Sequence, residues 1–309
     1  MIKSLTVRNY IGDEITITLT ELDPDHGLYV KSITGLGPPK GVINTSDYAV
    51  IDGSLYNSAR AEKRNIVMQL LFRETTNCPD VETARQNTYR YFPLKRQLTL
   101  IFETDHRLVE IKGYVESNEP DIFSEQESNQ ISIICDDPFF YEVGENNPQI
   151  TYFSNVTSLF EFEFDNNDLD ERLIELSKYE TTKEKVLVYS GDAETGIIIR
   201  VHVLDSIGNI TVYNFLTKER MFINNSKIEA LTGQALKEAD ELIISTMQNN
   251  QYVNLLREGN TINVLNAVDR SSDWIQLRPG DNVLAFTTDN ETDDNLEFSV
   301  ENRVLFWGI

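Results

Sequence analysis

Strict alternation of apolar and polar residues is the pattern that most constrains this chain. In residues 14–20, Ile15, Ile17 and Leu19 take every second position and polar residues lie between them. A period of two places the apolar side chains on one face of a half-buried strand. The pattern recurs in both halves of the chain, at residues 109–115, 131–135, 197–203 and 296–300. The sequence therefore predicts a mainly β fold.

Short turn sequences separate several of the predicted strands. Residues 104–106 lie between the apolar runs 98–103 and 107–116, and Gly208-Asn209 lies between 197–205 and 210–215. We expect each pair of runs to form a β-hairpin. Residues 35–53 contain turn signals and little else, so we expect an extended loop or arm there.

One segment, residues 79–92, has the period of a helix instead. Acidic residues open it, arginines follow, and Pro93 ends it, which are the usual boundary signals. Its apolar face is predicted to pack on the N-terminal sheet and consists of Val81, Ala84, Thr88 and Tyr91. A weaker helical pattern covers residues 169–178, and the second half carries no copy of the first helix.

The length of the chain predicts two domains. Its 309 residues exceed the usual size of one hydrophobic core. Turn-forming residues are concentrated at 144–148, directly after the aromatic cluster 139–141. We therefore expect one domain over residues 1–145 and a second over 146–309.

The charge and the cysteines exclude several classes of function. With 50 acidic against 27 basic residues the formal charge is −23, and such a surface repels nucleic-acid phosphates. Two cysteines, Cys78 and Cys135, are too few for a disulfide framework. No apolar run has the length of a membrane span, and the N-terminus lacks the apolar run of a secretion signal. We expect no specific nucleic-acid binding and no membrane insertion.

The segment Cys135-Asp136-Asp137-Pro138 admits a chemical and a structural interpretation. A thiol beside two carboxylates resembles part of a metal or catalytic site. However, Cys135 continues the inward set of Ile131 and Ile133, and Pro138 limits further strand pairing. We favour a buried cysteine followed by strand-ending turn residues.

The remaining candidate motifs lack the spacing that their chemistry requires. The glycine-rich run at 35–41 contains two prolines, which remove N–H donors that a phosphate needs. The acidic runs near residues 23–27, 165–168 and 289–294 do not form a calcium-binding loop. Scattered histidines give no ligand pair, and Trp274 and Trp307 are expected to fill a core or an interface. We predict no catalytic, cofactor-binding or metal-binding residue.

Several segments, taken in order, resemble the distal tail protein family of tailed phages, often called Dit. The resemblance covers nearly the whole chain and is weakest at residues 160–235. Its N-terminal motifs are Gly35-Leu36-Gly37-Pro38-Pro39, Asp52-Gly53, residues 64–72, 89–93, 111–115 and 131–140. Its C-terminal motifs are residues 241–246, 274–283 and the closing Phe306-Trp307-Gly308.

This resemblance implies a β-rich N-terminal domain with one short helix that closes into a hexameric ring, followed by a galectin-like β-sandwich. It implies a structural protein, not an enzyme, that joins the tail tube protein to the hub or tail-associated protein at the tail tip or baseplate. Receptor-binding proteins are further candidate partners, and synthesis takes place in the host cytoplasm. Residues 35–53 would reach a neighbouring copy, and residues 136–141 would lead into the sandwich.

The sequence leaves two other functions open. A carbohydrate-binding adhesin of a tail tip or of a tail-derived bacteriocin would need exposed aromatic residues beside polar groups. A hydrolase on the same scaffold would need a nucleophile with a base, and no such motif is present in the sequence.

Overall fold

The computed structural model describes residues 1–19, 25–49, 52–144, 147–158, 177–181, 183–289 and 292–309. The chain forms two compact units, one of residues 1–145 with 305–309 and the other of residues 146–304. The predicted second domain extended to residue 309, whereas the structure returns the last five residues to the first unit. They return because their strand pairs with one of that unit's strands.

The first unit is built on one antiparallel sheet. Within the described residues its main path runs β2-β1-β7-β8-β9-β6-β3, and the short strands β10 and β24 pair with each other beside β8. The strands are β1 (Ile2–Arg8), β2 (Glu14–Thr18), β3 (Leu28–Thr34), β6 (Arg64–Phe72), β7 (Gln97–Thr104), β8 (Leu108–Asp121), β9 (Ser128–Cys135), β10 (Phe140–Glu142) and β24 (Leu305–Phe306). The predicted hairpin across residues 104–106 is confirmed as β7 and β8.

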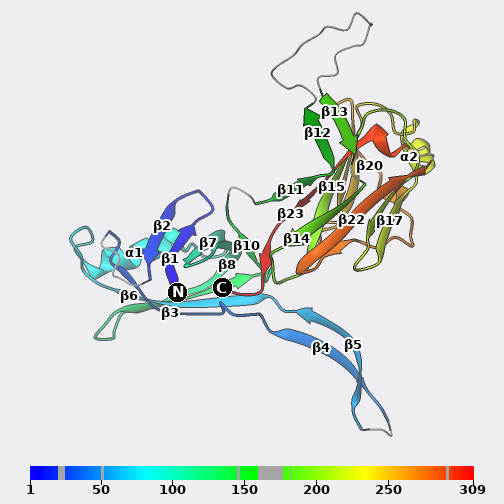
Figure 1. Ribbon diagram of the computed structural model, residues 1–309. Helices are drawn as coiled ribbons and strands as arrows, with labels where there is room; N and C mark the ends of the chain where they lie inside the picture. Colours follow the sequence, from blue (N-terminus) through cyan, green and yellow to red (C-terminus); the bar gives the residue numbers. More distant parts are fainter. Residues whose placement is uncertain (20–24, 50–51, 145–146, 159–176, 182, 290–291) are drawn as a thin grey trace, which may run out of the picture. The chain divides into compact units, whose positions relative to one another are not determined.

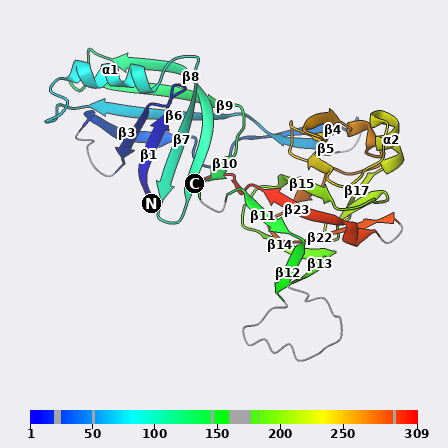
Figure 2. The same cartoon turned by 90° about the horizontal axis from the view of Figure 1, so that it is seen from above.

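Alternating apolar residues on these strands make the core of the first unit, as the period of two predicted. The helix α1 (Val81–Tyr91) lies alongside β6 and β8 (Figure 2) and contacts β6. Asp80 caps its first turn, and Ala84, Thr88 and Tyr91 are buried, so the predicted helix is confirmed. Asn129 of β9 donates to the hydroxyl of Thr88 at 3.0 Å, which ties the helix to the sheet.

The segment predicted as a loop or arm is a β-hairpin. Strands β4 (Gly41–Asp47) and β5 (Ser54–Ala61) pair only with each other in the part of the chain that is described. They leave the main sheet of the first unit as a long arm (Figure 1). The sequence prediction missed both strands because their polar residues hide the alternation.

The second unit contains two facing sheets. One has the order β11-β23-β15-β18-β19-β20 with β21 paired to β15, the other the order β14-β22-β16-β17, and β12 pairs with β13. The strands are β11 (Gln149–Tyr152), β12 (Ser154–Ser158), β13 (Ser177–Thr181), β14 (Glu184–Tyr189), β15 (Thr195–Val203), β16 (Ile210–Asn214), β17 (Glu219–Ile223), β18 (Glu241–Ser245), β19 (Tyr252–Arg257), β20 (Asn260–Asn263), β21 (Gln276–Leu277), β22 (Gly280–Thr288) and β23 (Leu296–Asn302).

Aromatic contacts join these two sheets. Phe286 of β22 stacks on Phe298 of β23 with ring centroids 4.6 Å apart, and Phe153 meets Phe298 edge-on at 4.9 Å. Because β22 and β23 belong to different sheets, the pair closes the interior of a β-sandwich. The predicted mainly β fold, with one short helix in the first half and a sandwich in the second, is confirmed.

Two predictions about the second half differ from the structure. The expected hairpin over residues 197–215 is wrong, because β15 and β16 lie in different sheets of the sandwich. Alternation shows which face of a strand is buried but not which strand lies beside it. The helix α2 (Asn225–Thr232) was missed, although Asn224 caps it and Gly233 ends it in the left-handed region. The weak helix at 169–178 lies outside the described residues, apart from its last two positions in β13.

Candidate assembly site

A buried arginine organises the segments that carried the family resemblance. Strand β6 buries every second residue, and Arg64 occupies the first position of that buried face with 2% exposure. Burial lowers the pKa of its guanidinium from the usual value. A charge in such a place requires hydrogen-bond partners on all sides.

Four backbone carbonyl groups from three distant segments accept hydrogen bonds from Arg64. Its Nε donates to Pro138 at 2.9 Å, and its Nη2 donates to Trp307 at 2.6 Å. Its Nη1 donates to the carbonyl groups of both Gly35 and Gly37. The guanidinium also lies 4.5 Å from the ring centroid of Phe140. We call this group, Arg64 with its four carbonyl acceptors and Phe140, the Arg64 clamp.

The clamp explains why the glycine-rich run is not a phosphate loop. Gly35 and Gly37 direct carbonyl oxygens at Arg64, whereas a phosphate would need N–H donors. Gly35 has a φ of +85°, and an added Cβ would lie 2.1 Å from the carbonyl oxygen of Asn65. The C-terminal Ile309 donates its N–H to Leu36 at 3.2 Å. The run therefore fixes one end of the arm to the closing strand.

The cysteine at the end of β9 is buried, as the sequence favoured. Cys135 is fully buried, and an added Cβ on the neighbouring Gly113 would lie 2.9 Å from its sulfur. Asp137 accepts hydrogen bonds from the N–H of Phe139 at 3.2 Å and from the hydroxyl of Tyr141. Pro138 supplies a carbonyl to the clamp. Among the described residues, the two carboxylates and the thiol belong to no group of three or more side chains that could hold a metal ion.

The buried thiol leads to a test of reactivity. Desolvation raises the pKa of Cys135 to about 12, so at pH 8 about one molecule in ten thousand carries the reactive thiolate. We expect iodoacetamide to leave Cys135 unmodified in the folded protein and to modify it fully in urea, as measured by peptide mass spectrometry. A Ser58→Cys variant on the exposed arm is the matched control and should react within minutes. Equal rates at both positions would contradict a buried Cys135.

The arm exposes apolar side chains along its length. Ile43 is 66% exposed, Tyr56 is 62% exposed and Leu55 is 51% exposed. The register pairs Ile43 with Ala59 and Thr45 with Tyr56, so these four side chains share one face of the hairpin. The opposite face includes Asn44, paired with Ser58, and Leu55. A two-stranded hairpin with an exposed apolar face is marginal in water without a partner.

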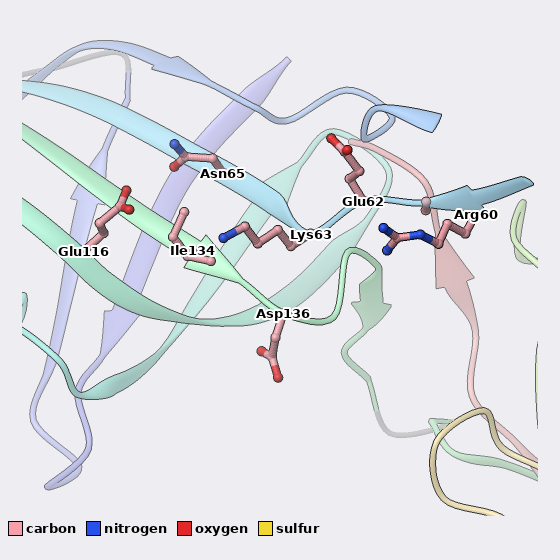
Figure 3. A pocket seen from close by; sticks show the side chains of 8 residues that line it. Arg60, Glu62, Lys63, Asn65, Glu116, Ile134 and Asp136 are labelled. Atoms are coloured by element: carbon pink, nitrogen blue, oxygen red, sulfur yellow. The ribbon is translucent and has the colours of Figure 1, made fainter. Parts of the chain in front are cut away.

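A charged pocket lies at the root of the arm. Its volume is about 580 Å³, and Figure 3 shows the side chains around it, which belong to Arg60, Glu62, Lys63, Asn65, Glu116, Ile134 and Asp136. Among the described residues, none of the ion pairs involves Arg60, Glu62 or Lys63. Charges of both signs are thus available here for an outside contact.

The other sequence candidates take structural positions. Trp307 is half-buried and packs on Phe139 with centroids 4.7 Å apart, and Trp274 is half-buried in the second unit. Where the chain is described, no cluster of three or more histidine, cysteine or acidic residues could hold a metal ion. No helix in the described segments has the length and apolar character to cross a membrane.

Sequence reasoning did not single out Arg64, although a signal was present. Every second residue of β6 belongs to one buried face, and Arg64 is the first of them. The others are Ile66, Met68, Leu70 and Phe72. The carbonyl partners of Arg64 could not be read from the sequence because they lie far from it along the chain.

The comparisons with known proteins address both units. Residues 190–301, which lie within the second unit, match the family model described as siphovirus-type tail component, C-terminal domain. The chain is similar to the crystal structure of phage SPP1 Dit, with a TM-score of 0.59 and 13% sequence identity. The match covers 98% of this chain and 100% of the SPP1 Dit chain. The chain has the distal tail protein fold. The resemblance stated from the sequence motifs is thereby confirmed.

Two other similar structures show the baseplate of phage P2 in its activated conformation. The one with Ca matches at a TM-score of 0.43 and 10% identity, covering 98% of this chain and 98% of that chain. The one with Sr matches at a TM-score of 0.40 and 11% identity, covering 96% and 97%. No curated protein matches the chain.

Proposed function

We propose that this chain is a structural distal tail protein, which forms a hexameric ring at the tail tip or baseplate of a phage or of a tail-derived bacteriocin. The ring would join the tail tube protein to the hub or tail-associated protein and to receptor-binding proteins. In this proposal residues 1–145 with 305–309 form the ring, and residues 146–304 carry the galectin-like sandwich. The chain acts mechanically and catalyses no reaction.

The arm is the observation that carries this proposal. Its apolar face has no partner within the described part of the chain, and a neighbouring copy would cover it. If the same contact is repeated around a closed axis, each arm is covered by a neighbouring copy, and the assembly cannot grow into a fibre. The charged pocket at the arm's root suits the polar rim of the same contact.

The similarity to SPP1 Dit supports the location. That protein is described as a paradigm of the hub adsorption apparatus in phages that infect Gram-positive bacteria. The match of residues 190–301 to a siphovirus-type tail component agrees with the same location.

The mass of the purified protein in solution tests the ring. We expect light scattering to give six times the chain mass of 35.4 kDa, and electron microscopy to show rings with an open centre. The measurement is repeated with the candidate hub or tail-associated protein of the same particle added, to cover assembly that requires the hub. A species that stays monomeric in both conditions would rule out the ring.

A further inference from the structure

The outer face of the sandwich carries an aromatic cluster. Buried Val212 and Asn214 point inward from β16, so Tyr213 between them points outward. The rings of Tyr213 and Phe215 are stacked, with centroids 6.2 Å apart and planes 13° from parallel, and Phe215 is 55% exposed. On the next strand, β17, the cross-strand partners on the same face are Arg220 and Phe222.

Arg220 lies between two of these aromatic rings. Its guanidinium carbon is 5.9 Å from the ring centroid of Tyr213 and 5.7 Å from that of Phe222. Within the described residues, its side chain donates no hydrogen bond and forms no ion pair. The aromatic contacts hold the guanidinium in place, while its N–H donors stay available. We call Tyr213, Phe215, Arg220 and Phe222 the outer platform.

A pocket of about 250 Å³ adjoins the outer platform. It is lined by Arg220 and Phe222 and by Asp269, Ser271 and Ser272. The loop that carries Asp269, Ser271 and Ser272 is hydrogen-bonded to β17. The N–H of Asp269 donates to Phe222 at 2.9 Å, and the N–H of Phe222 donates to the hydroxyl of Ser272 at 2.9 Å. The wall of the pocket is therefore formed before any ligand binds, which lowers the cost of binding.

The polar groups of the pocket combine donors with acceptors. Asp269 Oδ1 accepts from the N–H of Ser271 at 2.9 Å and from its hydroxyl at 2.6 Å. These bonds hold the pKa of Asp269 below its usual value, so this carboxylate is charged at neutral pH. Its other oxygen is left for a donor from outside. A guanidinium and a carboxylate thus border one small cavity beside exposed aromatic faces.

This combination selects one class of ligand. A free anion would be repelled by Asp269 and a metal ion by Arg220. A sugar ring presents adjacent hydroxyl groups, which donate to a carboxylate and accept from a guanidinium, and an apolar face that stacks on an aromatic ring. The volume of the pocket suits one such ring with part of a second lying over the platform.

We propose that the outer platform and its pocket bind an uncharged saccharide through adjacent ring hydroxyl groups. The carboxylate of Asp269 accepts a hydrogen bond from one hydroxyl group, and Arg220 donates one to the oxygen of the neighbouring hydroxyl group. The ring of Phe222 or Tyr213 supports the apolar face of the sugar. The site lies wholly in the second unit, and its existence does not depend on the proposed ring.

Saturation-transfer NMR with the full-length protein tests this site. The probes are the methyl glycosides of glucose, galactose, N-acetylglucosamine and rhamnose, each at millimolar concentration, with glycerol phosphate as the anionic comparison. We expect transfer to the ring protons of at least one glycoside and none to glycerol phosphate. No transfer to any glycoside, or stronger binding of glycerol phosphate, would overturn the proposal.

Variants locate the binding on the protein. We expect Arg220→Ala and Asp269→Asn each to weaken the best glycoside by about tenfold or more, because each leaves a sugar hydroxyl without its partner. Arg278→Ala is the matched control, since Arg278 is an exposed arginine of the same unit that pairs with Glu194. Unchanged affinity in both platform variants would also overturn the site. All three should keep the mass of the native assembly, so failure here is distinguishable from failure of the ring.

Discussion

Replacement of Arg64 by methionine is expected to lower the free energy of unfolding of the first unit by about 3–5 kcal/mol, because buried acceptors then lose their charged donor. The four carbonyl groups of the Arg64 clamp belong to the glycine-rich run, the Asp-Pro segment and the C-terminal tail. Methionine fills similar volume but donates nothing. Arg64→Lys keeps the charge but lacks the planar guanidinium group with its several N–H donors. We therefore expect a smaller loss in the free energy of unfolding than for methionine.

The two tryptophans allow each unit to be followed separately. Trp307 belongs to the first unit and Trp274 to the second. In a Trp274→Phe background, the fluorescence of Trp307 during guanidinium chloride unfolding gives the stability of the first unit. A Trp307→Phe background gives that of the second, which should not change with Arg64.

The matched control for the clamp is Arg60→Met. Arg60 is an exposed arginine at the root of the arm, and its loss is expected to change stability by less than about 0.5 kcal/mol. If Arg64→Met costs no more than Arg60→Met, the clamp does not hold the first unit together.

Polar substitution on one face of the arm is expected to break the assembly. Ile43 and Tyr56 lie on the same face and are exposed in the single chain. Loss of two such side chains from an interface removes about 3–5 kcal/mol per contact, which lowers the association constant by about two to four orders of magnitude. For the Ile43→Ser/Tyr56→Ser variant we therefore expect light scattering to give the mass of one chain.

Leu55→Ser is the control for this experiment. Leu55 is 51% exposed but lies on the opposite face of the hairpin, so the assembly should keep its mass. Circular dichroism checks that both variants remain folded. An intact assembly in the double variant would show that this face of the arm makes no contact between copies, and breakage only by Leu55→Ser would assign the contact to the other face.

Local pattern predicted several of the single elements. The alternation around Ile15, Ile131 and Ile197 gave buried strand faces because burial of alternate side chains is a local property of a strand. The helix ending at Tyr91 was predicted equally well because its cap and stop signals are adjacent in sequence. Pairing is not local, and this is why β15 and β16 were wrongly joined in one hairpin.

The candidate site was predicted only in part, because its contacts join residues that are far apart in the sequence. The family motifs around Gly35, Pro138 and Trp307 were recognised singly, but the sequence does not show that one arginine hydrogen-bonds to all three. A loop or arm was expected over residues 35–53, but neither of its strands was predicted, and β5 lies beyond that range. The outer platform depends on cross-strand register between Tyr213 and Arg220 and on a loop about fifty residues further along the chain, and no local pattern predicts either.

The return of the C-terminal strand makes the second unit an insertion within the first. The chain departs after β10 and comes back as β24, where Phe140 faces Phe306 and Tyr141 faces Leu305. The strand before the insertion, β10, and the strand after it, β24, are therefore neighbours joined by backbone hydrogen bonds. An inserted domain can be replaced between two such strands without interrupting the sheet of the first unit at any other point. A force that pulls on the inserted unit is shared by two covalent connections.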